Sequence, residues 1–249
     1  MKKFIYIILS IAVLVSVYLF WSHWFIYYQL GKIDLQIPNT PSTYLMGTQQ
    51  KTDEALVYVA LGDSLTSGLG VTDYAQSYPY LVADKLAKTT GNGYSVSNLS
   101  FPGYRIIDLI NNLLPSAIEA QPDLVTILIG VNDIHGAVSK VTFEKAYRHI
   151  LTELTQKTTA KIYLISIPFI GSETLLMPPY NSYFQEQTED YNKIVKQLAD
   201  EYHLVYIDVY TPTLNLFQKD GSHYSTDSFH PSAEGYSLWA EIIYDALNR

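Results

Sequence analysis

Four short segments of this chain carry groups that suit nucleophilic attack on a carbonyl carbon. The hydroxyl of Ser64 comes from Gly62-Asp63-Ser64-Leu65, and the second segment ends in Gly103. The amide of Asn132 comes from Gly130-Val131-Asn132-Asp133, and the carboxylate of Asp227 and the imidazole of His230 come from Asp227-Ser228-Phe229-His230. A serine hydroxyl becomes a good nucleophile when an imidazole takes its proton and an acid orients that imidazole. N–H groups can then stabilise the oxyanion. The ordered set carries the inference, because a single four-residue match is weak.

Each of these residues also has a purely structural interpretation. A serine at the start of a helix commonly caps it, Pro102-Gly103 is a turn signal, and an asparagine after a strand often forms an Asx turn. Ser64 taken alone leaves both interpretations open, whereas the apolar run before Asn132 favours a donor role. The histidines other than His230 are interpreted as surface or hydrogen-bonded structural residues: His23, His135, His149, His203 and His223.

Two further acids compete with Asp227 to be the carboxylate that orients the imidazole. Asp63 and Asp208 both come at the ends of predicted strands, and Asp208 could reach a histidine across the sheet edge. Asp63 and Asp133 are expected to hold loops through local hydrogen bonds. The residues alone therefore leave Asp208 and Asp227 as alternatives.

From residue 55 onward, apolar runs of strand length alternate with longer periodic segments. Strands are expected at 56–61, 95–99, 124–129, 161–167 and 204–207, and helices at 78–88, 106–119, 143–156, 183–202 and 232–247. This alternation predicts a parallel five-stranded sheet in a three-layer α/β/α sandwich. The four segments follow the first, second, third and fifth strands. They are therefore expected at one edge of the sheet, where such sheets bind ligands.

The first part of the chain has the character of a membrane span. Residues 4–20 are apolar except for two serines, follow Lys2 and Lys3, and precede a cluster of tryptophans and tyrosines. About 20 apolar residues cross a bilayer, and aromatic clusters mark its interface. We expect a signal anchor at 1–28 with its N-terminus in the cytoplasm, a linker at 29–54 and an exported domain at 55–249. A cleaved signal peptide is the alternative, but no Ala-x-Ala site follows the run.

Composition excludes several function classes. The 249 residues are 48% hydrophobic and 16% charged, as in a folded protein, and the net charge of -8 argues against a nucleic-acid partner. Without cysteine there is no thiolate metal site. His223, Asp227 and His230 lack a recognised ligand spacing, so neither a metal nor another cofactor is expected.

The four segments together resemble the sequence blocks of the GDSL or SGNH hydrolase family, over residues 56–236. The resemblance implies a flavodoxin-like SGNH hydrolase fold with Ser64 as nucleophile, His230 as general base and Asp227 as its orienting acid. It also implies an oxyanion hole formed by the N–H groups of Ser64 and Gly103 and the amide of Asn132. The Gly-x-Ser-x-Gly elbow of α/β-hydrolases is not present around Ser64.

The same resemblance implies an extracytoplasmic serine ester hydrolase, of the lipase or acylhydrolase kind, that works through an acyl-enzyme. The family also contains enzymes on lipids, acyl thioesters and acetylated sugars. A transacylase using the same acyl-enzyme on a lipid or cell-envelope sugar is therefore the alternative. A third hypothesis is a non-catalytic, membrane-tethered binding protein. The complete set of motif residues disfavours it.

The substrate is expected to be an ester-containing small molecule, a lipid or a cell-envelope glycan. Residues 169–183 and 210–224 are rich in apolar side chains close to the expected site. These side chains could line an apolar acyl groove or simply pack in the core, which is the commoner situation.

Overall fold

The computed structural model describes residues 2–32, 43–47, 55–169, 171–172, 174–219 and 221–248. In this part of the chain, six strands form one sheet in the order β1-β3-β2-β4-β5-β6. The strands are β1 (Thr43–Met46), β2 (Leu56–Gly62), β3 (Tyr94–Ser100), β4 (Leu124–Leu128), β5 (Lys161–Ile165) and β6 (Val205–Ile207). All neighbouring pairs are parallel except β1 with β3.

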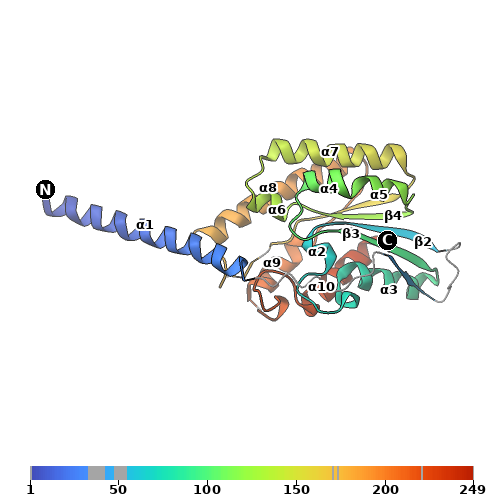
Figure 1. The fold of residues 1–249 in the computed structure, drawn as a ribbon, viewed down its shortest axis with the longest axis horizontal. Coiled ribbons are helices and arrows are strands. Elements are labelled where there is room, and N and C mark those ends of the chain that lie inside the picture. Colours follow the sequence, from blue (N-terminus) through green and yellow to red (C-terminus); the bar gives the residue numbers. More distant parts are fainter. Residues whose placement is uncertain are drawn as a thin grey trace.

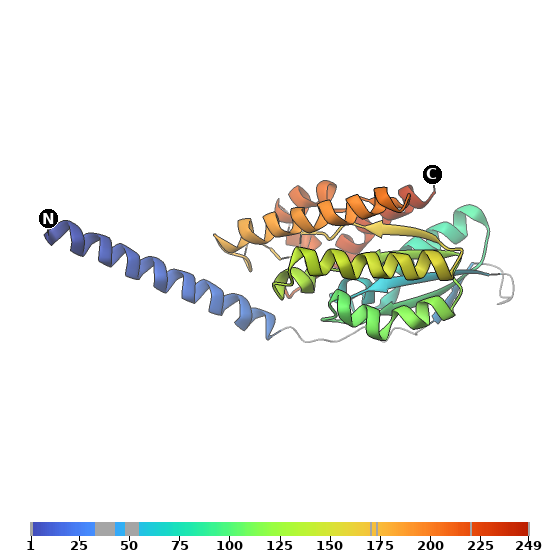
Figure 2. The same cartoon turned by 90° about the horizontal axis from the view of Figure 1, so that it is seen from above.

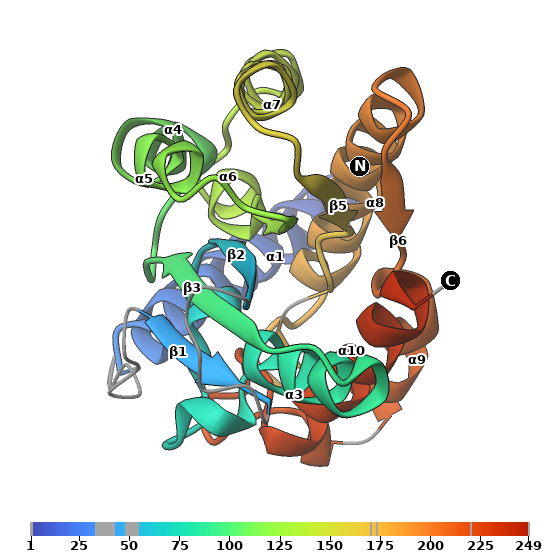
Figure 3. The ribbon, with the colours of Figure 1, turned by 90° about the vertical axis from the view of Figure 1, so that its right-hand side faces the viewer.

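Helices cover both faces of the sheet, which confirms the three-layer sandwich. One face carries α3 (Tyr78–Thr90) and α10 (Ala233–Leu247), and the other carries α4 (Ile106–Asn112), α5 (Leu114–Glu119), α7 (Lys140–Lys157) and α8 (Tyr180–Glu201) (Figures 1 and 3). Shorter elements follow the strands or link these helices: α2 (Ser64–Ser67), η2 (Tyr74–Gln76), α6 (Val131–His135), α9 (Tyr210–Lys219) and η3 (Gly221–His223).

The expected five-stranded parallel sheet is wrong in one respect, because β1 adds a sixth, antiparallel strand at the edge. These four residues lie in the range expected to be a linker. Tyr44 and Met46 are 8% and 7% exposed, while the alternating residues Thr43 and Leu45 are exposed to solvent. A strand with one solvent face alternates in this way, and four residues among polar neighbours gave too short a pattern to predict.

A second difference concerns the helix expected at 106–119, which is two helices. Pro115 stands within the first turn of α5. Proline has no N–H to donate to the carbonyl one turn earlier, so a helix continuing from α4 loses a hydrogen bond there. The chain therefore stops α4 at Asn112 and starts α5 at Leu114.

The register of the three central strands brings their following loops together. All five residues of β4 are buried, as expected for a strand covered on both faces. Gly62 at the end of β2 is paired with Ser100 at the end of β3 and with Leu128 at the end of β4. The loops after β2, β3 and β4 therefore leave the same edge of the sheet side by side.

Helix α1 (Lys2–Leu30) projects from that same end of the domain (Figure 2). In Figure 1, α2 and α6, which follow β2 and β4, lie at the end of the sheet nearest α1. Within the described residues, α1 is the one helix long and apolar enough to cross a membrane. Its outer part is exposed, but Ser22 and Ile26 near its end are buried against the domain.

Candidate active site

Ser64 lies at a sharp turn between β2 and α2. A Cβ on Gly62 would stand 2.1 Å from Thr66 Oγ1 and 2.4 Å from the carbonyl oxygen of Leu128, so only glycine fits this turn. Asp63 caps α2, because its Oδ1 accepts a hydrogen bond of 3.0 Å from the Leu65 N–H. Ser64 is then the first residue of the helix, where a backbone N–H is free of helical acceptors.

The structure brings Ser64, His230 and Asp227 into one chain of hydrogen bonds. The Nε2 atom of His230 lies 3.0 Å from Ser64 Oγ, and its Nδ1 lies 2.7 Å from Asp227 Oδ2. An ionised carboxylate can only accept, so Nδ1 carries the proton and Nε2 is left to accept the Ser64 hydroxyl proton. Ser64 and His230 are 4% and 3% exposed, which shields this chain from water.

Asp227 is held in its ionised form. Its Oδ1 accepts hydrogen bonds from Ser225 Oγ at 2.8 Å, from the Phe229 N–H at 2.7 Å and from the His230 N–H at 2.8 Å. Burial alone would raise the pKa of Asp227, but the hydrogen bonds from His230 and from the two backbone N–H groups outweigh it. They lower the pKa from 3.8 to about 2. The carboxylate is therefore charged whenever the imidazole needs a counter-ion.

Gly103 and Asn132 lie on the neighbouring loops. Gly103 has φ +81, and the position of a Cβ there has no other heavy atom within 4 Å, so the space beside it is open. The Asn132 amide donates to the carbonyl oxygen of Tyr104 at 3.0 Å. An amide nitrogen has two hydrogens, so this bond orients the group and leaves one N–H for another acceptor.

The other acids hold loops rather than contact the imidazole. Asp133 Oδ2 accepts from the Ile106 N–H at 3.0 Å, which ties the loop after β3 to the loop after β4. Asp208 Oδ1 accepts from the Thr211 N–H at 2.9 Å in the first turn of α9. In the residues that the structure describes, no group of three or more His, Asp or Glu side chains is placed to hold a metal ion.

Two of these acids, Asp63 and Asp133, are buried with one carboxylate oxygen unpartnered. Burial raises the pKa of Asp63 to about 7, with a further contribution from the charge of Asp133. Burial likewise raises the pKa of Asp133 to about 7. Both groups therefore tend to be neutral in mildly acidic solution, directly beside the nucleophile and the Asn132 amide.

Several of the apolar side chains expected near the site are core residues, whereas Leu216 is 45% exposed. Phe169, Leu175, Leu176 and Phe217 are all between 0% and 3% exposed. Residues 210–219 form α9, a helix that the sequence did not indicate. Ile170 lies outside the described residues.

A cleft of about 540 Å³ adjoins the acid side of the triad. It is lined by Leu69–Thr72, by Thr174 and Leu175, by Ser225–Ser228, by Phe25 and Gln29 near the end of α1, and by Lys32 just after that helix. Sequence reasoning missed the part played by α1, Ser225 and Gly70. Ser225 stands two residues before the acid, and its hydroxyl donates to Asp227 Oδ1 at 2.8 Å.

Comparison with known proteins shows the family and the fold of this chain. The sequence profile of the GDSL-like lipase/acylhydrolase family matches residues 60–238. The chain belongs to this family. The match runs from Ala60 within β2 to Leu238 within α10, so it includes every loop of the GDSL-like site described above.

The GDSL-like chain is similar to several bacterial proteins. An uncharacterized Bacillus subtilis protein, YpmR, is 28% identical over 229 residues, which cover 81% of this chain and 85% of YpmR. The acetylxylan esterase of Geobacillus stearothermophilus is 24% identical over 157 residues, which cover 61% of this chain and 71% of the esterase.

Solved structures share the GDSL-like fold. The acetylxylan esterase structure matches with a TM-score of 0.63 at 22% identity, covering 79% of this chain and 95% of the esterase chain. The lipase/acylhydrolase of Enterococcus faecalis matches with a TM-score of 0.65 at 22% identity, covering 77% and 95%.

Proposed function

We propose that this GDSL-like chain is a serine ester hydrolase that acts through an acyl-enzyme on Ser64. The observation that carries the proposal is the continuous hydrogen-bond chain from Ser64 Oγ through His230 to Asp227. The loops that carry Gly103 and Asn132 leave the same sheet edge as Ser64, and their N–H groups would supply the oxyanion donors. A nucleophile, a base, an orienting acid and oxyanion donors are what ester hydrolysis needs.

The proposed reaction runs in two balanced halves. Ser64 Oγ bonds to the acyl carbon while its proton passes to His230 Nε2, and the N–H groups of Ser64, Gly103 and Asn132 hold the oxyanion. His230 then gives the proton to the leaving alcohol as the C–O bond breaks. Water adds to the acyl-enzyme, losing its proton to His230, and the carboxylic acid leaves as Ser64 recovers the proton.

We also propose that α1 anchors the enzyme in the cell membrane with the catalytic domain on the outer side. The helix has the length and composition of a membrane span. Lys2 and Lys3 precede the apolar run, and basic residues favour the cytoplasmic side. Protease treatment of intact cells would test this, since only an outward-facing domain would be digested.

The catalytic proposal is tested by labelling the full chain, in detergent micelles, with a fluorophosphonate probe. Wild type should be labelled and Ser64→Ala should not. Ser67→Ala is the matched control, because Ser67 is another buried serine of the same short helix and should leave labelling intact. A folded wild-type chain that takes no label would reject the assembled triad. Product analysis with a soluble acetate ester and a high concentration of glycerol as acceptor distinguishes hydrolysis from acyl transfer, because a hydrolase releases mainly free acid and a transacylase forms the glycerol ester.

A further inference from the structure

The end of the domain that holds the active site also contacts the apolar helix directly. The Tyr18 hydroxyl of α1 donates to the carbonyl oxygen of Pro178 at 2.7 Å, and the Tyr180 hydroxyl donates to the carbonyl oxygen of Leu19 at 3.4 Å. The ring of His23 lies 6.0 Å from the ring of Tyr180. The loop before α8 and the first turn of α8 therefore lie alongside α1.

The position of this contact along α1 is informative. Tyr18 and Leu19 belong to the apolar run, which extends to Phe20, and the tryptophans and tyrosines of the expected interface come after them. If α1 spans the bilayer, the domain residues beside Tyr18 lie at least as deep as the aromatic belt. Such a position is where headgroups meet acyl chains.

The composition of this part of the domain fits such a depth. Residues 174–185, called here the tip segment, contain no charged side chain, although the chain as a whole carries a net charge of -8. Pro178, Pro179 and Tyr183 in the tip segment are exposed, with Tyr183 at 50%. Exposed tyrosines are typical of membrane interfaces, because an apolar ring and a polar hydroxyl suit both media.

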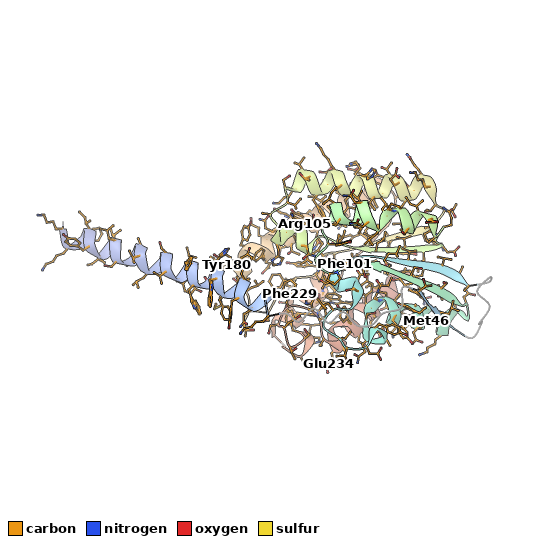
Figure 4. All side chains as sticks on the ribbon, viewed as in Figure 1. Met46, Phe101, Arg105, Tyr180, Phe229 and Glu234 are labelled. Atoms are coloured by element: carbon orange, nitrogen blue, oxygen red, sulfur yellow. The ribbon has the colours of Figure 1, made fainter. Side chains whose placement is uncertain are left out.

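The cleft beside Asp227 opens further out along α1 than the contact at Tyr18. Phe25, which lines the cleft, follows Tyr18 by seven residues, or about 10 Å of helix rise toward the outside. Figure 4 shows Phe101, Arg105 and Phe229 at the end of the domain that faces α1, with Tyr180 beside the helix and Met46 at the opposite end. The exposed Phe101, 49% accessible, adds an aromatic side chain on the loop that carries Gly103.

We propose that the tip segment inserts into the outer membrane interface next to α1 and holds the active-site edge against the bilayer. The partner of this surface is the lipid surface itself, and the ester substrate is carried by a membrane lipid whose polar part reaches the cleft at the level of Phe25. The substrate part of this inference depends on the proposed ester hydrolase function, while the docking part depends only on α1 crossing the membrane.

The docking is tested with single-cysteine variants of the full chain, which has no cysteine of its own. Tyr183→Cys carries an environment-sensitive fluorophore into the tip segment. Val205→Cys is the matched control, because Val205 is 46% exposed at the first residue of β6, at the opposite edge of the sheet. Both are reconstituted in phosphatidylethanolamine and phosphatidylglycerol vesicles. Lipids with a quencher near the headgroup should quench position 183 at least about twofold more than position 205. Equal quenching at both positions would overturn the proposal.

The substrate is tested by comparing two esters. Tyr183→Glu, at a helix first turn where a carboxylate is tolerated, should lower the ratio of vesicle-lipid turnover to soluble-acetate turnover by about three- to tenfold, because a carboxylate resists insertion. Val205→Glu should leave the ratio unchanged. A wild-type chain that cleaves the soluble ester but not the lipid would overturn the lipid substrate alone. A wild-type chain that cleaves neither would reject the proposed function, while the quenching result would still decide the docking.

Discussion

The choice of Asp227 as the acid that orients His230 leads to a sharp prediction for Asp227→Asn. The asparagine would keep an oxygen at the Oδ1 position, so the Ser225 hydroxyl and the N–H groups of Phe229 and His230 retain their acceptor. The loop should therefore fold as in wild type. At the Oδ2 position, however, an NH₂ group would face His230 Nδ1 across 2.7 Å.

Two donors cannot bond to each other, so the imidazole would move its proton from Nδ1 to Nε2. The Nε2–H would then point at Ser64 Oγ, 3.0 Å away, and could not accept the hydroxyl proton. The nucleophile loses its base while the oxyanion donors remain. We expect kcat to fall by about 10⁴-fold, the loss caused by the same wrong tautomer in serine proteases. That factor corresponds to about 5.5 kcal/mol of activation free energy.

The assay is steady-state turnover of a soluble acetate ester by the full chain in detergent, alongside fluorophosphonate labelling. Asp208→Asn is the control. Its oxygen still accepts the Thr211 N–H at the start of α9, and asparagine caps helices as well as aspartate does. Its kcat should stay within about twofold of wild type. If Asp208→Asn lost as much activity as Asp227→Asn, the assignment of the acid would be refuted.

Three further outcomes are expected. Asn132→Ala should lower kcat by about 10²- to 10³-fold with little change in KM, measured by steady-state kinetics, because an oxyanion donor acts in the transition state. Gly70→Ala should lower both turnover and Tm, because the added Cβ would stand 2.4 Å from the carbonyl oxygen of Pro231. Gly91→Ala is the control: its φ of +74 strains an alanine, but no heavy atom lies within 4 Å of the added Cβ, so Tm should change while turnover stays the same. Burial raises the pKa of Asp63 from 3.8 to about 7. Between pH 4 and pH 7, Asp63 is therefore protonated in the folded state and ionised in the unfolded state. Stability should therefore fall by about 1–3 kcal/mol as pH rises from 4 to 7. Asp63→Asn should reduce this decline in thermal unfolding followed across pH and leave the part that comes from Asp133, whose pKa burial also raises to about 7.

The sequence predicted the layers and the parallel strands well, because long periodic segments leave little choice of element. The strands 124–128 and 161–165 fall inside their expected ranges, and the helices around 143–156 and 232–247 have the expected positions. Short elements escaped prediction. β1 gives four residues of alternation. α9 begins at Tyr210, three residues after the end of β6 at Ile207, and its Thr211 and Pro212 resemble a loop.

The candidate site was predictable for a different reason, since its residues stand at the carboxyl ends of strands, where topology alone brings loops together. The loops that carry Ser64, Gly103 and Asn132 leave the sheet side by side because β2, β3 and β4 end in register. The choice between Asp208 and Asp227 was not predictable from strand ends, because both were compatible with the edge. In the folded loop, Asp227 stands three residues before His230 and its carboxylate contacts the Nδ1 atom of His230.

The part of α1 in the cleft could not be predicted, because a hydrophobic run specifies that a helix crosses a membrane and not which face meets the domain. Ser22 and Ile26 lie one helical turn apart and are both buried, so they mark the face of α1 that packs on the domain. Phe25 and Gln29 lie on the neighbouring side of the helix, which lines the cleft. A helix fixed in this way has a defined rotation against the catalytic loops. The anchor is therefore a structural wall of the cleft as well as a proposed tether, and replacing it with an unrelated membrane span would keep the attachment while removing that wall.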